Sequence, residues 1–233
     1  MMPASEEIVV LSGGAMRRFM TEAVPLFERA SGRRVAIRYA PTREMKAEIE
    51  AGAAFDVALL PRSAIDALVQ SGKVASGTPI DVVRSLVGLM VRTGSAEPDI
   101  GTVDKFIGVL RQAKSISHST GPSGQYVGAL LERLGLSAEM KEKTVLAIGR
   151  PVGEVIAGGE AEIGMQQIIE NQPVAGARLV GPLPAALGNF VAYTAGFAAG
   201  VPGRSAVRDF VGFLASSAVA GVIRAKGMEP AST

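Results

Sequence analysis

The feature that most constrains the fold is an alternation of apolar strands and amphipathic helices that begins at Ile8. The strands and helices predicted in this part are, in order, Ile8–Leu11, Met16–Ser31, Val35–Tyr39, Glu44–Ala51, Phe55–Leu60 and Ala64–Ser71. The strands are short apolar runs, whereas the helices repeat apolar residues at a spacing of three to four. Such alternation predicts an α/β fold with a mainly parallel sheet and helices on both faces. Ligands of these sheets bind outside the carboxyl ends of the strands.

A second run of alternation occupies the middle of the chain and leads into a C-terminal helix. Its predicted elements are Ser85–Arg92, Val103–Ala113, Ser115–Ser117, Tyr126–Leu134, Thr144–Ile148, Gly153–Ala157, Ile163–Gln166, Leu179–Pro184, Phe190–Tyr193 and Ser205–Arg224. No low-complexity linker separates the two runs. Two lobes joined by strands therefore fit this pattern better than two domains on a flexible tether.

Composition excludes several classes of function. Lys and Arg number 24 against 22 Asp and Glu, and with no Trp and three Tyr the chain lacks a basic, aromatic surface for nucleic acid. The absence of Cys excludes disulfides and thiolate chemistry. His118 is the single histidine, and no metal-ligand spacing, nucleophile elbow or phosphate loop is present. We therefore predict no metal and no cofactor.

Two Ser/Gly loops stand between a strand and a helix and are typical of anion sites. The first contains Ser12, Gly13, Gly14 and Ala15, and the second runs from Ser119 to Gly124 through Thr120 and Ser123. Glycines let a ligand approach the backbone, and a helix N-terminus offers unpaired N–H groups. Either loop could instead be a tight connecting turn.

Further candidate ligand residues follow other strands. Thr42 and Arg43 open the second helix, where a hydroxyl can cap the helix or bind a ligand and a guanidinium can pair with a carboxylate. Gln166 and Gln167 end a strand and offer uncharged amide donors. His118, beside the second loop, is either a packed histidine or a group that donates and titrates.

Several passages resemble the molybdate-binding-protein-like group of type 2 periplasmic solute-binding proteins. They are Ile49-Glu50-Ala51-Gly52 with Asp56-Val57, Gly121–Tyr126, Ala161–Gln167 and Leu179–Pro184, and together the similar segments cover nearly the whole chain. The resemblance implies two α/β lobes joined by two crossing strands and closing on a ligand. Lobe I would comprise residues 1–85 and 195–233, and lobe II residues 86–194.

The resemblance also implies positions for the ligand contacts. The hydroxyl and backbone donors of the molybdate binders fall here on Ala15, Thr42 with Arg43, Ser123 and Val152, and their tyrosine falls on Gln167. Arg43, His118 and the two glutamines suit an organic carboxylate better than a tetrahedral metal oxyanion, which is usually held by neutral dipoles. The expected ligand is therefore a small carboxylate.

Three functions remain open on the sequence. The favoured one is a monomeric solute-binding protein that serves a membrane permease. The second is a cofactor-independent isomerase of an unsaturated polycarboxylate such as aconitate, with His118 and Ser123 as catalytic candidates. The third is a cytoplasmic anion sensor. The resemblance implies a periplasmic location, whereas Met1–Glu7 lacks a signal pattern, which favours the cytoplasm if Met1 is the native start.

Overall fold

The computed structural model describes residues 7–170, 174–200 and 205–231, and residues 1–6, which bear on the signal pattern, lie outside that range. The chain forms two compact units. Unit 1 contains Met1–Arg84 and Ala192–Thr233, and unit 2 contains Ser85–Val191. The boundaries fall inside two strands, β4 (Ile80–Arg92) and β9 (Phe190–Phe197), rather than in loops.

Unit 1 is built on a sheet in the order β2 (Val35–Ala40), β1 (Ile8–Gly13), β3 (Val57–Pro61) and β9. The first three strands are parallel, as the alternation predicts, whereas β9 runs antiparallel to β3. Because the parallel strands end together, the β1–helix and β2–helix junctions of this unit lie at one edge of the sheet.

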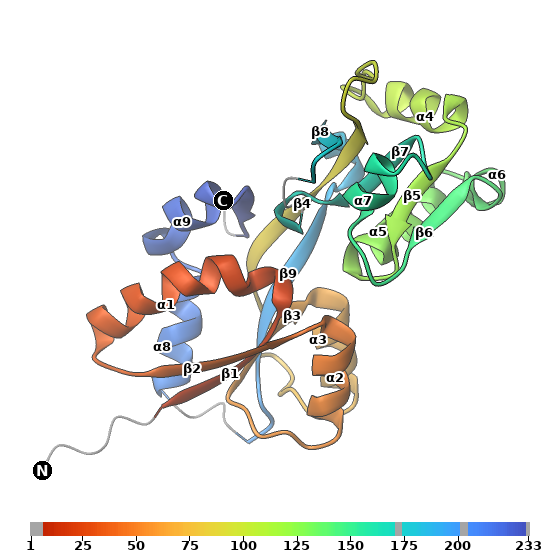
Figure 1. Ribbon diagram of the computed structural model, residues 1–233. Coiled ribbons are helices and arrows are strands. Elements are labelled where there is room, and N and C mark those ends of the chain that lie inside the picture. The colour runs from red at the N-terminus through yellow and green to blue at the C-terminus, as the bar shows by residue number, and fades with distance from the viewer. Residues whose placement is uncertain (1–6, 171–173, 201–204, 232–233) are drawn as a thin grey trace, which may run out of the picture. The chain divides into compact units, whose positions relative to one another are not determined.

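Helices pack on both faces of this sheet. They are α1 (Arg17–Ser31), α2 (Thr42–Glu50), α3 (Arg62–Gln70), α8 (Ser205–Leu214) and α9 (Ala220–Ala225) (Figure 1). Ala58 and Leu60 point to the face covered by α2 and α3, where they join Ile49 and Leu68 in one buried cluster. Elsewhere in the unit, the Phe27 ring of α1 meets the Phe210 ring of α8 edge-on, with 5.0 Å between centroids.

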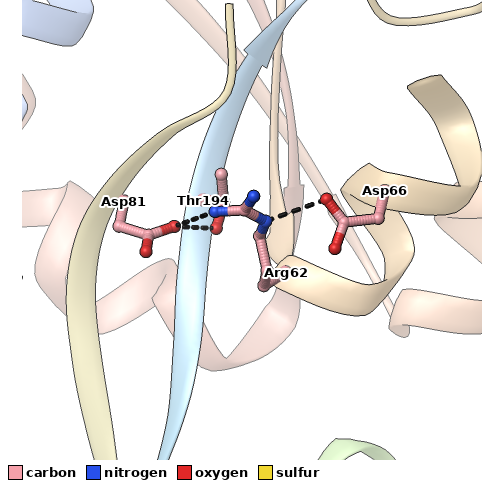
Figure 2. Close-up of polar contacts among 4 residues, drawn as sticks. All are labelled: Arg62, Asp66, Asp81 and Thr194. Carbon is pink, nitrogen blue, oxygen red and sulfur yellow. Dashed lines mark hydrogen bonds and ion pairs between the residues drawn. The ribbon is translucent and has the colours of Figure 1, made fainter. Parts of the chain in front are cut away.

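A polar cluster fastens α3 to the two strands that cross the unit boundary. Arg62 Nε donates to Asp66 Oδ1 at 2.8 Å, and Arg62 Nη1 lies 3.4 Å from Asp81 Oδ1 on β4 (Figure 2). The buried Thr194 hydroxyl on β9 donates to the same Asp81 oxygen at 2.5 Å. The carboxylate of Asp81 therefore links α3, β4 and β9 within unit 1.

The predicted C-terminal helix Ser205–Arg224 is wrong as a single element. The structure divides it into α8, a 3₁₀ turn at Ser217–Val219 and α9. Ser216 causes the break, because its hydroxyl donates to Phe213 O at 2.7 Å and accepts the N–H of Ala218 at 3.3 Å. These bonds end one helix and cap the next turn.

Unit 2 has a mixed sheet. Strands β6 (Thr144–Ala147), β5 (Ile116–Ser119) and β7 (Ile163–Gln167) are parallel neighbours, and β4 pairs antiparallel with β7 and with β8 (Ala177–Pro182). The helices are α4 (Val103–Gln112), α5 (Pro122–Arg133), α6 (Ser137–Lys141), which the sequence pattern did not predict, and α7 (Val152–Ala157). A last short strand, β10 (Met228–Pro230), pairs with β4 in unit 1, and just after it Ala231 N donates to Val82 O at 3.1 Å.

The predicted α/β class is confirmed, with antiparallel strands β9, β4 and β8 added to the parallel core of each unit. Across the described residues, no single helix is long and apolar enough to cross a membrane. The pair Ser205–Leu214 and Ser217–Ala225, bent by 51°, meets that test together by length and composition alone.

Candidate functional site

The first Ser/Gly loop lies at the carboxyl end of β1 in unit 1. Ser12 and Gly13 are the last residues of the strand, and Gly14 and Ala15 begin a 3₁₀ turn that leads into α1. Ser12 is fully buried, and its hydroxyl donates to Gly13 O at 3.3 Å. Gly14 is exposed and Ala15 half-buried. In this structure the open part of the loop is therefore the backbone at Gly14 and Ala15 rather than the Ser12 hydroxyl.

Thr42 and Tyr193 flank this loop. A Cβ atom built on Gly13 would stand 3.5 Å from Thr42 Oγ1 and 3.6 Å from Tyr193 Cε1, so both side chains pack against the glycine. Thr42 is the first residue of α2, whereas Arg43 beside it is exposed. Tyr193 was not among the predicted site residues, because the antiparallel pairing of Pro61 with Tyr193 that places it here is a long-range contact.

A second arginine, Arg17, stands close to the same loop. Its guanidinium carbon lies 4.3 Å from the centre of the Tyr39 ring, and Tyr39 pairs with Ser12 in the sheet. Burial raises the pKa of the Tyr39 hydroxyl, and the charge of Arg17 partly opposes that shift. Arg17 is exposed at the first turn of α1, so the loop carries a positive charge that the sequence analysis did not assign to it.

The second Ser/Gly loop, in unit 2, is shorter than predicted because α5 begins at Pro122 rather than at Tyr126. Proline suits the first helical position, where no N–H partner is needed. The Ser119 hydroxyl accepts the N–H of Gly121 at 3.2 Å and lies 3.2 Å from the Ser123 hydroxyl. Ser123 and Gly124 are thus buried residues of the first helical turn, while Thr120 is exposed.

Gly124 has a packing role. A Cβ atom at this position would lie 1.6 Å from Ser119 O and 3.2 Å from His118 Nδ1. No side chain fits there unless α5 moves away from the end of β5. The glycine therefore sets how closely the helix start approaches the strand end.

Three predicted ligand residues of unit 2 converge on one carboxylate, that of Glu170, and a fourth, Val152, is linked to it through Gln166. Gln166 Nε2 donates to Glu170 Oε2 at 3.2 Å, and Gln167 Nε2 donates to Glu170 Oε1 at 3.1 Å. The Ser123 side chain also interacts with this carboxylate and lowers the pKa of Glu170. Gln166 Oε1 in turn accepts the N–H of Val152 at 3.0 Å. Ser123, Val152, Gln166, Gln167 and Glu170 are called the Glu170 cluster below.

The environment of Glu170 favours its uncharged form. Burial raises the pKa of the Glu170 carboxyl above its ordinary value, and the bonds from Gln166, Ser123 and Gln167 offset part of the shift. In the described part of the chain, no cation pairs with it. Glu170 was missed in the sequence, although its spacing of three and four residues from the two glutamines is the spacing of one helical turn.

Among the described residues, no hydrogen bond joins the His118 side chain to the Glu170 cluster. Its Nδ1 atom is 2.9 Å from Ser119 O, and the ring lines a hollow of about 430 Å³ together with Leu131, Met140 and Leu146. The described residues contain no group of three or more His, Asp or Glu side chains able to hold a metal ion.

Known proteins resemble this chain over nearly its whole length. The family model of bacterial extracellular solute-binding proteins matches residues 8–229. An aconitate isomerase from a Pseudomonas species is 31% identical over 229 residues, which cover 96% of this chain and 87% of that protein.

Two solved structures share the fold. A substrate-binding domain from Clostridium difficile assigned to a molybdenum ABC transporter has a TM-score of 0.74 at 18% identity, with 97% of this chain and 99% of that chain covered. A tungstate ABC transporter protein from Geobacter sulfurreducens has a TM-score of 0.71 at 14% identity, with 95% and 99% covered. The resemblance seen in the sequence is thus confirmed, and the chain belongs to the family of bacterial extracellular solute-binding proteins.

Proposed function

We propose that this chain binds a small organic polycarboxylate. The residues that support this proposal are Gly14, Ala15 and Thr42 in unit 1 and Ser123, Gln166 and Gln167 in unit 2. Neutral N–H and O–H donors and a nearby arginine form a set that suits carboxylates. The positive charges at Arg17 and Arg43 add to the attraction for an anion. The relative named for its action on aconitate, a tricarboxylate, supports the same ligand class.

One observation carries this proposal. The Ser123 hydroxyl and the two glutamine amides already hold a carboxylate, that of Glu170. The two amide nitrogens bind its two separate oxygens, which matches the planar, two-oxygen shape of a carboxyl group. This supports an organic carboxylate over the tetrahedral oxyanions.

Isothermal titration calorimetry tests the proposal. Aconitate, citrate and malate are compared with molybdate, tungstate and sulfate, and we expect the carboxylates to bind more tightly. No heat with any carboxylate, or a preference for molybdate, would contradict it.

Two variants test the candidate ligand residues of each unit separately. Thr42→Val in unit 1 and Ser123→Ala in unit 2 each remove one donor, and each should weaken binding by about tenfold, the effect of one hydrogen bond of about 1.4 kcal/mol. Thr21→Val is the control, because Thr21 is exposed on α1 and its hydroxyl bonds to Arg17 O of the same helix. A variant that binds as tightly as the wild type would show that its hydroxyl does not contact the ligand.

An isomerase of an unsaturated polycarboxylate is the second candidate function. The relative at 31% identity is named for such a reaction. Glu170, a half-buried carboxyl whose pKa burial raises, lies among the predicted ligand residues, and such a group suits proton transfer. Conversion of trans-aconitate to the cis isomer, followed by NMR, tests it. His118→Ala and Ser123→Ala test the two catalytic residues that the sequence indicates.

The family relationship supports a proposal for the biological setting. We infer that a monomer delivers its ligand to a membrane permease from the periplasm. Light scattering of the purified protein, osmotic-shock fractionation of the cells and co-purification with a permease test these three points. A protein confined to the cytoplasmic fraction would favour an anion sensor.

A further inference from the structure

A carboxylate such as that of Glu170 is not expected in a site that only binds anions. A carboxylate beside an anionic ligand repels it, and burying the charge costs free energy unless it is paired. The donors around Glu170 are neutral and come from β7 and α5. Along the described chain, no Lys or Arg compensates the charge. Such a residue costs the protein both stability and affinity, and proton transfer is a role that would account for it.

We propose that Glu170 is the base that removes and returns the proton in an allylic isomerisation of an unsaturated carboxylate bound beside Ser123, Gln166 and Gln167. The proposal rests on the second candidate function above. It assigns the proton transfer to a residue other than His118, whose described side-chain hydrogen bond is with Ser119 O and not with the Glu170 cluster.

The step balances without water, metal or oxidant. Glu170 takes a proton from the methylene carbon next to the double bond, and the electron pair of that C–H bond spreads over the allyl unit and its carboxylates. The same proton then returns from Glu170 to the other end of the allyl unit. The double bond has moved by one carbon, and Glu170 is again ionised.

The residues around Glu170 serve both of its protonation states. Gln166 Nε2, Gln167 Nε2 and the Ser123 hydroxyl donate to the ionised carboxylate. Gln167 Oε1 is buried with no hydrogen-bond partner among the described residues. Rotation of this amide would turn its oxygen toward a protonated Glu170, which then donates to it. Glutamine is one of the few side chains that can do both.

Access to a ligand is also consistent with this role. Glu170 is half-buried, unlike Gln167 and Ser123, which are almost fully enclosed. Glu170 is thus the one residue of the cluster that is not classed as buried. A substrate carbon that reaches it would meet a carboxyl group already held by neutral donors.

The test follows trans-aconitate by proton NMR in D₂O and measures binding by calorimetry. It compares the wild-type protein with Glu170→Gln, Glu170→Asp and the control Glu154→Gln, an exposed carboxylate on α7 of the same unit. We expect Glu170→Gln to lose at least about 100-fold in conversion. It should still bind no more weakly than the wild type, because a repelling charge is gone.

Two further readouts separate a base from a structural residue. Glu170→Asp keeps the carboxylate and should retain part of the activity. The kcat/KM of the wild type should rise with pH as Glu170 loses its proton. The pH profile of any residual activity in Glu170→Gln should lack this rise. Glu154→Gln should match the wild type in both measurements. If Glu170→Gln fails to fold, the Asp variant and the pH profile decide the question.

The possible failures are distinguishable. Wild-type protein that binds trans-aconitate without converting it overturns the role of Glu170 and leaves the solute-binding function intact. Conversion that persists in Glu170→Gln assigns the proton to another group and leaves the isomerase intact. If a folded Glu170→Gln variant loses both binding and conversion, Glu170 is a binding residue and its role as the base is refuted. A wild type that neither binds nor converts refutes both proposals.

Discussion

Two glycines one turn apart in α5 should respond to alanine in opposite directions. A Cβ at Gly124 would lie 1.6 Å from Ser119 O, whereas ordinary contacts begin near 3.4 Å. The start of α5 and the end of β5 must therefore separate by about 1.8 Å, the difference between these two distances. At Gly128, which is exposed in the same helix, a Cβ meets nothing within 4 Å.

The expected cost of Gly124→Ala is about 3 kcal/mol. The separation would break the bonds of Ser119 Oγ to Gly121 N and Ser123 Oγ, both 3.2 Å long, at about 1 kcal/mol each. Overpacking adds about 1–3 kcal/mol, and the better helix propensity of alanine returns up to about 1 kcal/mol. Gly128→Ala gains the propensity term alone, so it should stabilise the protein by about 0.5–1 kcal/mol.

Urea unfolding followed by far-ultraviolet circular dichroism measures both changes, since the chain has no Trp for a strong fluorescence signal. Because the chain has two units, coincident transitions by a second probe must first establish two-state behaviour. A folded Gly124→Ala within about 0.5 kcal/mol of the wild type would refute the packing role of Gly124. A change of the same sign in both variants would refute it too.

Four further substitutions have expected outcomes. Glu170→Gln should stabilise the protein at neutral pH but not at a pH below the ordinary glutamate pKa. Burial raises the pKa of this carboxyl, so its ionisation costs the folded wild type more free energy as the pH rises. Urea midpoints of the variant and the wild type that run parallel across pH would contradict this. Asp56→Ala should lower the free energy of unfolding in urea by about 1.5–3 kcal/mol, because the buried Asp56 carboxylate accepts the N–H of Val9 at 2.8 Å. A change near zero would show that a water molecule takes the place of the carboxylate as acceptor. Thr194→Val should lower the melting temperature more than Arg62→Ala does. The Thr194 hydroxyl is buried, whereas the ion pairs of Arg62 are half-exposed (Figure 2). The reverse order of melting temperatures would contradict this.

The elements of the fold were predictable because their signals are local. The strand at Val35–Tyr39 and the helix at Met16–Ser31 follow from apolar periodicity within a few residues, and the structure reproduces them within one residue at each end. The start of α5 was misplaced because Gly121-Pro122 resembles a loop, although proline is favoured in the first turn of a helix.

The candidate site was less accessible to sequence reasoning. The donors Ser123, Gln166 and Gln167 were identified from residue type, yet the carboxylate that they hold was not, since Glu170 follows a strand end in an unremarked turn. Tyr193 reaches Gly13 through pairing between strands that are distant in the sequence. Asp56, part of the passage that carried the family resemblance, has a structural contact with Val9 that residue type did not reveal.

The position of the unit boundaries inside β4 and β9 imposes an order on folding during synthesis. Unit 2 is one continuous segment, Ser85–Val191, whereas unit 1 needs residues from both ends of the chain. Until Ala192 and the following residues leave the ribosome, β3 lacks its antiparallel neighbour β9, and Phe27 lacks the Phe210 ring of α8. The wholly apolar edge of Val57–Pro61 is then open to pairing with another chain. Unit 2 can therefore complete its core first, while the nascent N-terminal segment depends on rapid translation or a chaperone to protect β3.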